Sequence, residues 1–255
     1  CVRHFSARTC DPFSVVVLGS CALGPGLRSR GGITTEAVTA PLYAYFVGRA
    51  AFDPSRPGRA TAAAVLGATI PGLDQLLRLL SPAAYLRYEG TVTHSLGAIV
   101  IWAVASAAIL ARGQSGRAKC RVASAAVLGL CAHLSLDVLG PIGARCFTPV
   151  SHTRIALYLI SPLDPILTLL VVIPAGIIHW KGHLGAKIAW IPLVLTAGYL
   201  CMCCTLHSRA CANVSRDAPP GDCDVAAIPI PLRPLEWYGV VSSRRTNELV
   251  GLDAP

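Results

Sequence analysis

Six long apolar stretches, separated by short polar segments, limit what this chain can fold into. Stretches of this length have to be buried, either in the core of a large protein or in a lipid bilayer, and a helix of about 20 apolar residues crosses the hydrocarbon layer. The chain has 255 residues, which is enough for roughly six such helices with their loops. The stretches comprise residues 36–52, 61–80, 94–111, 122–140, 163–179 and 186–206.

The composition decides between these two environments. Hydrophobic residues make up 53% of the chain and charged residues 14%, whereas about 25% of a typical soluble domain is charged. The mean hydropathy of +0.57 agrees with burial in lipid. We therefore predict an all-α fold, a multi-pass transmembrane bundle of about six helices with a polar site at one membrane face.

The apolar stretches also divide the chain into three parts. Residues 33–206 are predicted to form the membrane-embedded domain, and residues 207–255 an extended, partly irregular tail. Residues 1–32 are treated as an N-terminal extension, native or not, because the chain starts at Cys1 and its one methionine is Met202.

The basic residues predict the orientation in the membrane. Lys and Arg are most frequent in the loops after the first, third and fifth stretches, and basic residues in short loops favour the cytoplasmic side. Both termini then lie outside. The net charge of +9 fits this orienting role, and because no basic patch is interleaved with aromatic residues we expect no nucleic acid partner. The loop residues are Arg49, Arg56, Arg59, Arg112, Arg117, Lys119, Arg121, Lys181 and Lys187.

Five ionisable side chains meet at one membrane face under this topology. Each stands at an end of an apolar stretch that reaches the outer surface, and ionisable groups there are costly unless they pair or hold an ion. The sequence therefore predicts a functional site at the outer face, where Glu36 also lies. The five residues are Asp74, His94, His133, Asp137 and Asp164.

The strongest local pattern is H-x-x-x-D at His133 and Asp137. Residues i and i+4 lie on the same face of a helix, so the imidazole and the carboxylate can share a cation, or the carboxylate can orient the ring. The alternative is a buried pair that forms a hydrogen bond for packing alone, because burial of either group without a partner is costly.

Other polar positions also have structural alternatives. Thr91 or Thr93 can cap the helix that follows, with His94 as an interfacial histidine instead of a ligand. Asp74 can cap a short following helix or bind a metal. Asp164 stands before a proline, an arrangement that is frequent where a helix begins.

Taken together, five segments resemble the YdjM-like family of bacterial inner-membrane, metal-dependent hydrolases over residues 33–206. The order and the spacing of the segments are more specific than any one of them. They read I-P-G-L-D-Q at 70–75, E-G-T-V-T-H-S-L at 89–96, H-L-S-L-D-V-L-G at 133–140, F-T-P-V-S at 147–151 and S-P-L-D-P at 161–165. The tail segment P-L-R-P-L-E-W-Y at 231–238 resembles the extended Trp-containing segment that often ends such proteins.

The chain departs from the family's pattern at three places. Gly72 stands where the family usually has the first residue of an Asp-x-Asp pair that ends at Asp74. Glu36 stands near the place of a usual Thr-His pair, and Glu89 takes the place of a usual Arg. Either Glu36 and Glu89 supply substitute oxygens, or the catalytic power has decayed.

The resemblance implies a hydrolase with a bound divalent metal in the bacterial inner membrane. Neutral imidazoles and carboxylates suit zinc, which we favour, with Asp74, His94, His133 and Asp137 as ligands. Asp164 would orient a ligand or act as general base, and Asp137 would share in catalysis. The outer surface suggests a phosphoester or lipid-linked substrate and membrane lipid as the partner. The alternatives are a non-catalytic membrane protein with a structural or degenerate metal site and, less favoured, a small transporter.

Overall fold

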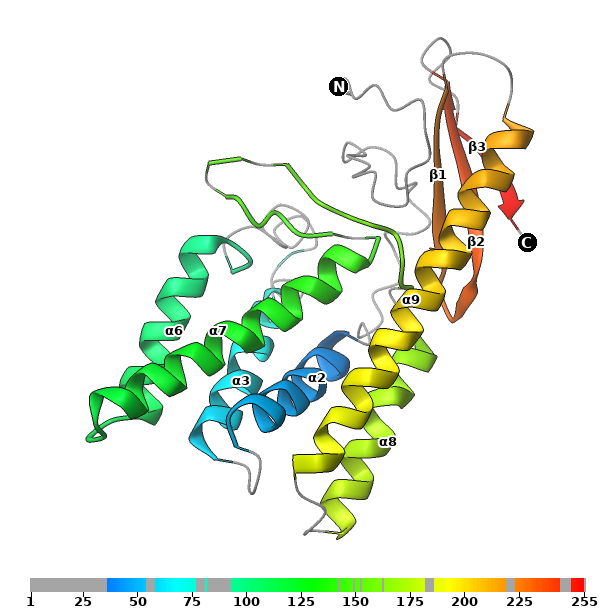
Figure 1. The fold of residues 1–255 in the computed structure, drawn as a ribbon. Coiled ribbons are helices and arrows are strands. Elements are labelled where there is room, and N and C mark those ends of the chain that lie inside the picture. Colours follow the sequence, from blue (N-terminus) through cyan, green and yellow to red (C-terminus); the bar gives the residue numbers. More distant parts are fainter. Residues whose placement is uncertain are drawn as a thin grey trace.

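The computed structural model describes residues 36–53, 58–76, 81, 93–141, 143–148, 150–151, 153–161, 163–181, 186–218, 223–243 and 249–254. Among them are six α-helices, one 3-10 helix and three β-strands (Figure 1). In chain order these are α2 (Glu36–Ala51), α3 (Arg59–Thr69), η1 (Pro71–Leu76), α6 (Leu96–Leu110), α7 (Gly116–Leu139), α8 (Pro165–Lys181), α9 (Ala186–Asp217), β1 (Cys223–Ile230), β2 (Arg233–Ser243) and β3 (Leu249–Ala254).

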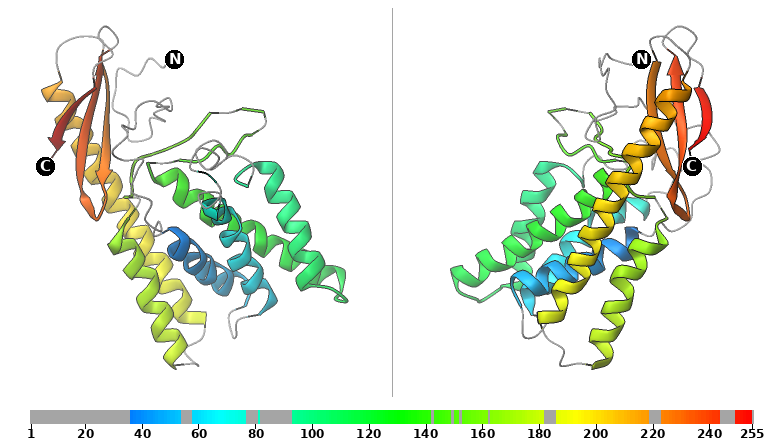
Figure 2. Two further views of the ribbon diagram at one scale, coloured as in Figure 1. Left: turned by 180° about the vertical axis from the view of Figure 1, so that it is seen from behind. Right: turned by 45° about the vertical axis from the view of Figure 1, so that its right-hand side comes forward.

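Helix α7 contacts three other helices, α2, α3 and α6 (Figures 1 and 2). Alanines of α3 and α7 form the cluster between these two helices, and such small side chains let helix backbones come close together. A second cluster joins the end of α7 to α2, α8 and α9 through larger side chains, among them Leu136, Leu167 and Tyr199. Helix α7 is therefore packed against the other helices on several of its sides. We call these six helices together the helical body.

The two ends of this body differ in their polar contacts. At one end, Asp53 accepts hydrogen bonds from Thr61 N at 2.8 Å and Thr61 Oγ1 at 2.9 Å, and pairs with Arg121 Nη2 at 3.1 Å. These contacts join the loop after α2 to the first turns of α3 and α7. At the other end, Leu96 N at the start of α6 donates to Cys146 O at 3.1 Å, and Leu157 N donates to Val138 O at 2.8 Å. The chain segment after α7 therefore lies against the end of α7 and the beginning of α6.

Two helices, Gly116–Leu139 and Ile188–Asp217, are long and apolar enough to cross a bilayer, and α6 and α8 are shorter apolar helices. Helices α2 and α3 have 16 and 11 residues. The predicted helical character is confirmed, and the described residues form six α-helices, as many as predicted. A multi-pass arrangement stays a prediction.

The second apolar stretch does not form the one long helix that its length suggests. Helix α3 ends at Thr69, and the chain continues through η1 from Pro71. Proline has no N–H for the helical hydrogen-bond ladder and its ring crowds the preceding turn, so a helix ends readily there. Asp74 is consequently held in a tight 3-10 turn.

The prediction of an all-α fold is wrong at the C-terminus. Three antiparallel strands form a sheet in the order β1-β2-β3. Helix α9 continues beyond Leu206, where the apolar stretch was expected to end, to Asp217. The reason is that Ala210, Cys211 and Val214 form an apolar stripe on the last turns of α9, and this stripe packs against Ala227, Trp237 and Val241 of the sheet.

The contact between α3 and α7 generates the first prediction. A Cβ atom on Gly129 would overlap the carbonyl oxygen of Ala64, so Gly129→Ala has to push the two helices apart. We expect a loss of about 1 to 3 kcal/mol in the free energy of unfolding, measured by denaturant titration in detergent.

The matched control is Gly198→Ala in α9, where no described atom lies within 4 Å of the added Cβ. This variant should be as stable as the parent or slightly more so, because alanine favours helix. Equal stability of both variants would show that the close approach of α3 to α7 is not needed.

Candidate metal site at the end of helix α7

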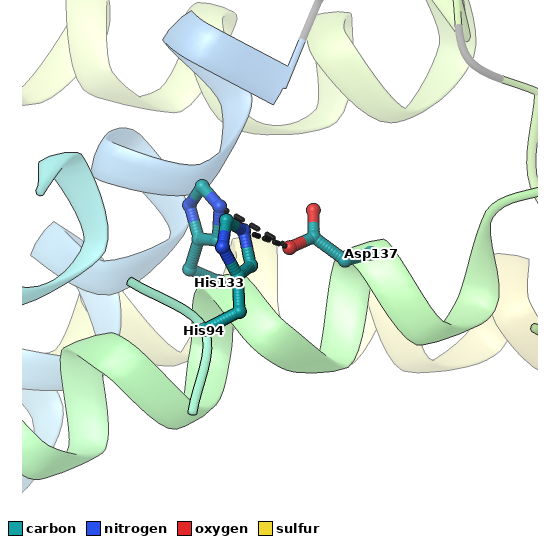
Figure 3. A group of neighbouring side chains, drawn as sticks. All are labelled: His94, His133 and Asp137. Atoms are coloured by element: carbon teal, nitrogen blue, oxygen red, sulfur yellow. Dashed lines mark ion pairs between the residues drawn. The ribbon is translucent and has the colours of Figure 1, made fainter. Parts of the chain in front are cut away.

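Three buried side chains converge near the end of α7 (Figure 3). His94, His133 and Asp137 each offer one ligand atom, and these atoms lie within 4.8 Å of one another. Asp137 Oδ2 lies 2.9 Å from His94 Nε2 and 3.3 Å from His133 Nε2. The three residues are between 4% and 8% exposed, so the group is shielded from solvent.

Local structure explains why these side chains meet. His133 and Asp137 are four residues apart on α7 and share one helix face. His94 comes from the turn before α6, whose N-cap is Ser95, with Ser95 Oγ accepting a hydrogen bond from Ala98 N at 3.2 Å. The cap is therefore Ser95 and neither Thr91 nor Thr93, which leaves the Thr93 hydroxyl available for another contact.

Nδ1 of His94, the outer ring nitrogen that faces away from His133 and Asp137, is held by Thr93 and Asp74. The Thr93 hydroxyl donates to Asp74 Oδ2 at 2.6 Å and lies 2.8 Å from His94 Nδ1. A hydroxyl has one hydrogen, so it has to accept from Nδ1–H of His94. His94 Nδ1 also lies 3.5 Å from Asp74 Oδ2. This relay fixes the ring so that Nε2 faces His133 and Asp137.

The four predicted ligands therefore separate into two groups. His94, His133 and Asp137 form the cluster, whereas Asp74 lies on the far side of the His94 ring. Thr93 was not predicted as a site residue, because its contact depends on the turn before α6 and on η1. Glu36 is the first residue of α2, and Glu89 lies outside the described residues.

Asp164 occupies a different environment. Its Oδ1 accepts a hydrogen bond from Leu167 N at 2.9 Å, which caps α8, and its Oδ2 accepts from the Tyr199 hydroxyl at 2.7 Å. Among the described residues, no contact joins Asp164 to His94, His133 or Asp137. Its placement agrees with the helix-start alternative from the sequence.

The cluster contains buried polar atoms that the described chain leaves without hydrogen bonds. Asp137 Oδ2 and His133 Nδ1 are such atoms, since neither short contact of Oδ2 with an imidazole has hydrogen-bond geometry. Buried polar groups without hydrogen bonds are rare and each costs about 1 to 3 kcal/mol. Two imidazole nitrogens that lie at ion-pair distance from one carboxylate oxygen, without hydrogen-bond geometry, fit the donor set of a divalent cation such as zinc.

Without a cation, the electrostatics of the cluster favour a charged His94. The carboxylates of Asp137 and Asp74 lie 2.9 Å from Nε2 and 3.5 Å from Nδ1 of this ring, and they favour its protonated form. The charged ring carries a proton on each nitrogen. A cation bound by Nε2 would have to displace one of these protons, so the site favours positive charge in either state.

Gly72 lies beside the ring of His133. A Cβ atom at this position would be 3.8 Å from His133 Cε1, which is an ordinary van der Waals distance. A longer side chain at position 72 would therefore extend along the edge of the imidazole. In this chain the described residues provide no such group.

Comparison with known proteins agrees with the sequence motifs. A model of the YdjM inner membrane protein family matches residues 34–210. The uncharacterized protein YfhP of Bacillus subtilis (strain 168) is 26% identical over 148 residues, which is 58% of this chain and 45% of YfhP. The match thus spans just under half the length of this relative. No solved structure matches the chain.

The relay from Asp74 through Thr93 to His94 can be tested through metal affinity. Thr93→Val removes the hydroxyl and keeps the branched shape, so the His94 ring loses the contact that orients it. We expect zinc affinity, measured by calorimetry on purified protein, to fall about 10 to 100-fold. Thr93→Ser restores the hydroxyl and should retain most of the affinity. A valine variant that binds zinc like the parent would contradict the relay.

Proposed function

The chain belongs to the YdjM inner membrane protein family, as its motifs predict, and we propose that it is a membrane-bound, metal-dependent hydrolase. The observation that carries this proposal is the convergence of two imidazole nitrogens on one buried carboxylate oxygen that has no hydrogen bond to any described residue. His94, His133 and Asp137 would hold the metal, for which zinc is the best candidate. This three-residue set would leave a coordination position open, as catalytic zinc sites require.

A bound divalent ion would supply an activated water and polarise the bond to be cleaved. The chain's own residues prepare the site for this chemistry. Thr93 and Asp74 hold His94 in the tautomer whose Nε2 can act as a ligand. Asp137 supplies negative charge next to both rings, and its proposed share in catalysis is to balance the charge of the cation. Asp164, which the sequence suggested as a general base, is assigned to the start of α8 instead.

The location of the site suggests the class of substrate. The cluster lies near the end of α7, whereas basic residues such as Arg117, Lys119 and Arg121 lie at its beginning. Under the predicted topology the basic end faces the cytoplasm and the site opens at the outer face of the bacterial inner membrane. A phosphoester or lipid-linked substrate could enter there from the lipid.

A second candidate function is a non-catalytic membrane protein with a structural or degenerate metal site. Gly72 favours this alternative, because it offers no side chain beside His133. Hydrolysis of phosphoesters by the metal-containing protein distinguishes the two functions. A protein that purifies with metal but hydrolyses neither soluble nor lipid phosphoesters would support the structural role.

The proposed topology predicts the accessibility of two loops. Gln114, between α6 and α7, should be cytoplasmic, and Val150, which is 94% exposed beyond the end of α7, should be outside. In intact cells a membrane-impermeant maleimide should label Val150→Cys and leave Gln114→Cys unlabelled above the background of the native cysteines. Labelling of Gln114→Cys at the rate of Val150→Cys would overturn the orientation.

Asp137→Asn tests the proposed metal site, because it nearly preserves shape and removes the charge that balances the cation. Zinc content and hydrolysis of phosphoesters should fall at least about 10 to 100-fold in a protein that remains folded. The matched control is Asp53→Asn at the other end of the helical body, which should keep its zinc. Unchanged zinc binding and unchanged turnover in Asp137→Asn would remove this residue from the site.

A further inference from the structure

Arg145 is distinguished among the described arginines by its surroundings. Most of these arginines are exposed, and three are at least partly buried: Arg49, Arg145 and Arg154. Arg49 lies 5.9 Å from the centre of the Tyr45 ring, and both Arg49 and Arg154 have further interaction partners. The Nε atom of Arg145 is buried and has no hydrogen-bond partner in the described chain.

A partly buried guanidinium group, whose Nε has no hydrogen-bond partner among the described residues, calls for an explanation. Desolvation of a charged group is costly unless an opposite charge or an acceptor compensates for it. Guanidinium groups bind carboxylates and phosphoryl groups through two parallel hydrogen bonds, which makes arginine the preferred residue for such anions. The described residues provide no anion at this position, and a bound anionic ligand would compensate for the charge.

The backbone holds Arg145 at the end of the molecule where the metal site lies. Its carbonyl oxygen accepts a hydrogen bond from Thr148 N at 3.3 Å, and the next carbonyl, Cys146 O, accepts from Leu96 N two residues after His94. Ala144 pairs with Ile155 in an isolated β-bridge. The segment is thus fixed against the turn that carries His94.

Two apolar side chains are exposed on the same short segment. Phe147 is 48% exposed and Val150 is 94% exposed. A buried cationic nitrogen on the same short segment as exposed apolar groups is complementary to a molecule with an anionic head and an apolar chain. The observations therefore point to an amphiphile and not to a uniformly polar ligand.

We propose that Arg145 binds the phosphoryl head of an amphiphilic substrate, while Phe147 and Val150 contact its apolar chain. This inference rests on the proposed hydrolase function, for which it names the substrate class and a specificity residue. The guanidinium binds and orients the oxyanion through charge-assisted hydrogen bonds. Arg145 does not hold the metal, so its role is separable from that of His94, His133 and Asp137.

The test uses the full, zinc-loaded chain in detergent and measures binding by calorimetry. Inorganic phosphate should bind the parent and should bind Arg145→Gln about 10 to 100-fold more weakly, because one charged hydrogen-bonding group is lost. Arg145→Lys should recover part of the affinity, since it restores the charge but not the two-pronged geometry. Zinc content should be unchanged in both variants. Arg112→Gln, an exposed arginine in the loop after α6, is the matched control and should bind phosphate like the parent.

A second ligand separates a lipid head from a free oxyanion. Dihexanoyl phosphatidic acid should bind the parent more tightly than inorganic phosphate does, and Phe147→Ala should weaken only the lipid. Equal affinities for both ligands would assign the site to a free oxyanion and would remove the apolar part of the proposal. Phosphate affinity that is unchanged in Arg145→Gln, or no phosphate binding by a zinc-loaded parent, would overturn the role of Arg145 and leave the metal site standing. A parent that binds no zinc would instead refute the proposed function itself.

Discussion

The buried carboxylate of Asp137 between two imidazole rings is the interaction on which the arrangement of this molecule depends. Two histidines from separate parts of the chain approach the same oxygen, so α6, α7 and the turn between η1 and α6 have to be positioned together. The small residues between α3 and α7 serve this purpose, because they bring η1 with Asp74 close to the face of α7 that carries His133. The geometry of the candidate site therefore depends on how these helices pack.

The sequence predicted the part of this site that depends on helical periodicity. His133 and Asp137 are four residues apart in an apolar helix, so their shared face follows from helix geometry alone. The position of His94 followed from the topology of apolar stretches, and the structure brings it to the same place. The pattern of these three residues was enough to predict that they lie close together, and their role as a metal site stays a prediction.

The roles of Asp74, Thr93 and Asp164 depend on local geometry that the pattern does not encode. Ser95 caps α6 in place of Thr93, and this shift by two residues turns the Thr93 hydroxyl toward Asp74. The C-terminal sheet was missed for a related reason. Its strands pack on an apolar stripe that extends α9 beyond the end of the apolar stretch, and a stripe of three residues is a weak signal next to a long hydrophobic helix.

The asymmetry between the two histidines bears on whether the proposed metal site would be catalytic or structural. The outer nitrogen of His94 is bound to Thr93 and lies near Asp74, whereas that of His133 is buried without a partner and its ring faces Gly72. A purely structural site gains from having both rings fixed, because each hydrogen bond to an outer nitrogen orients a ligand and raises its basicity. A site that has to admit a substrate benefits from space beside one ligand. Gly72 places no side chain next to His133 while the other ring stays fixed. The glycine that suggests decay in the sequence is for this reason also compatible with the proposed catalytic role.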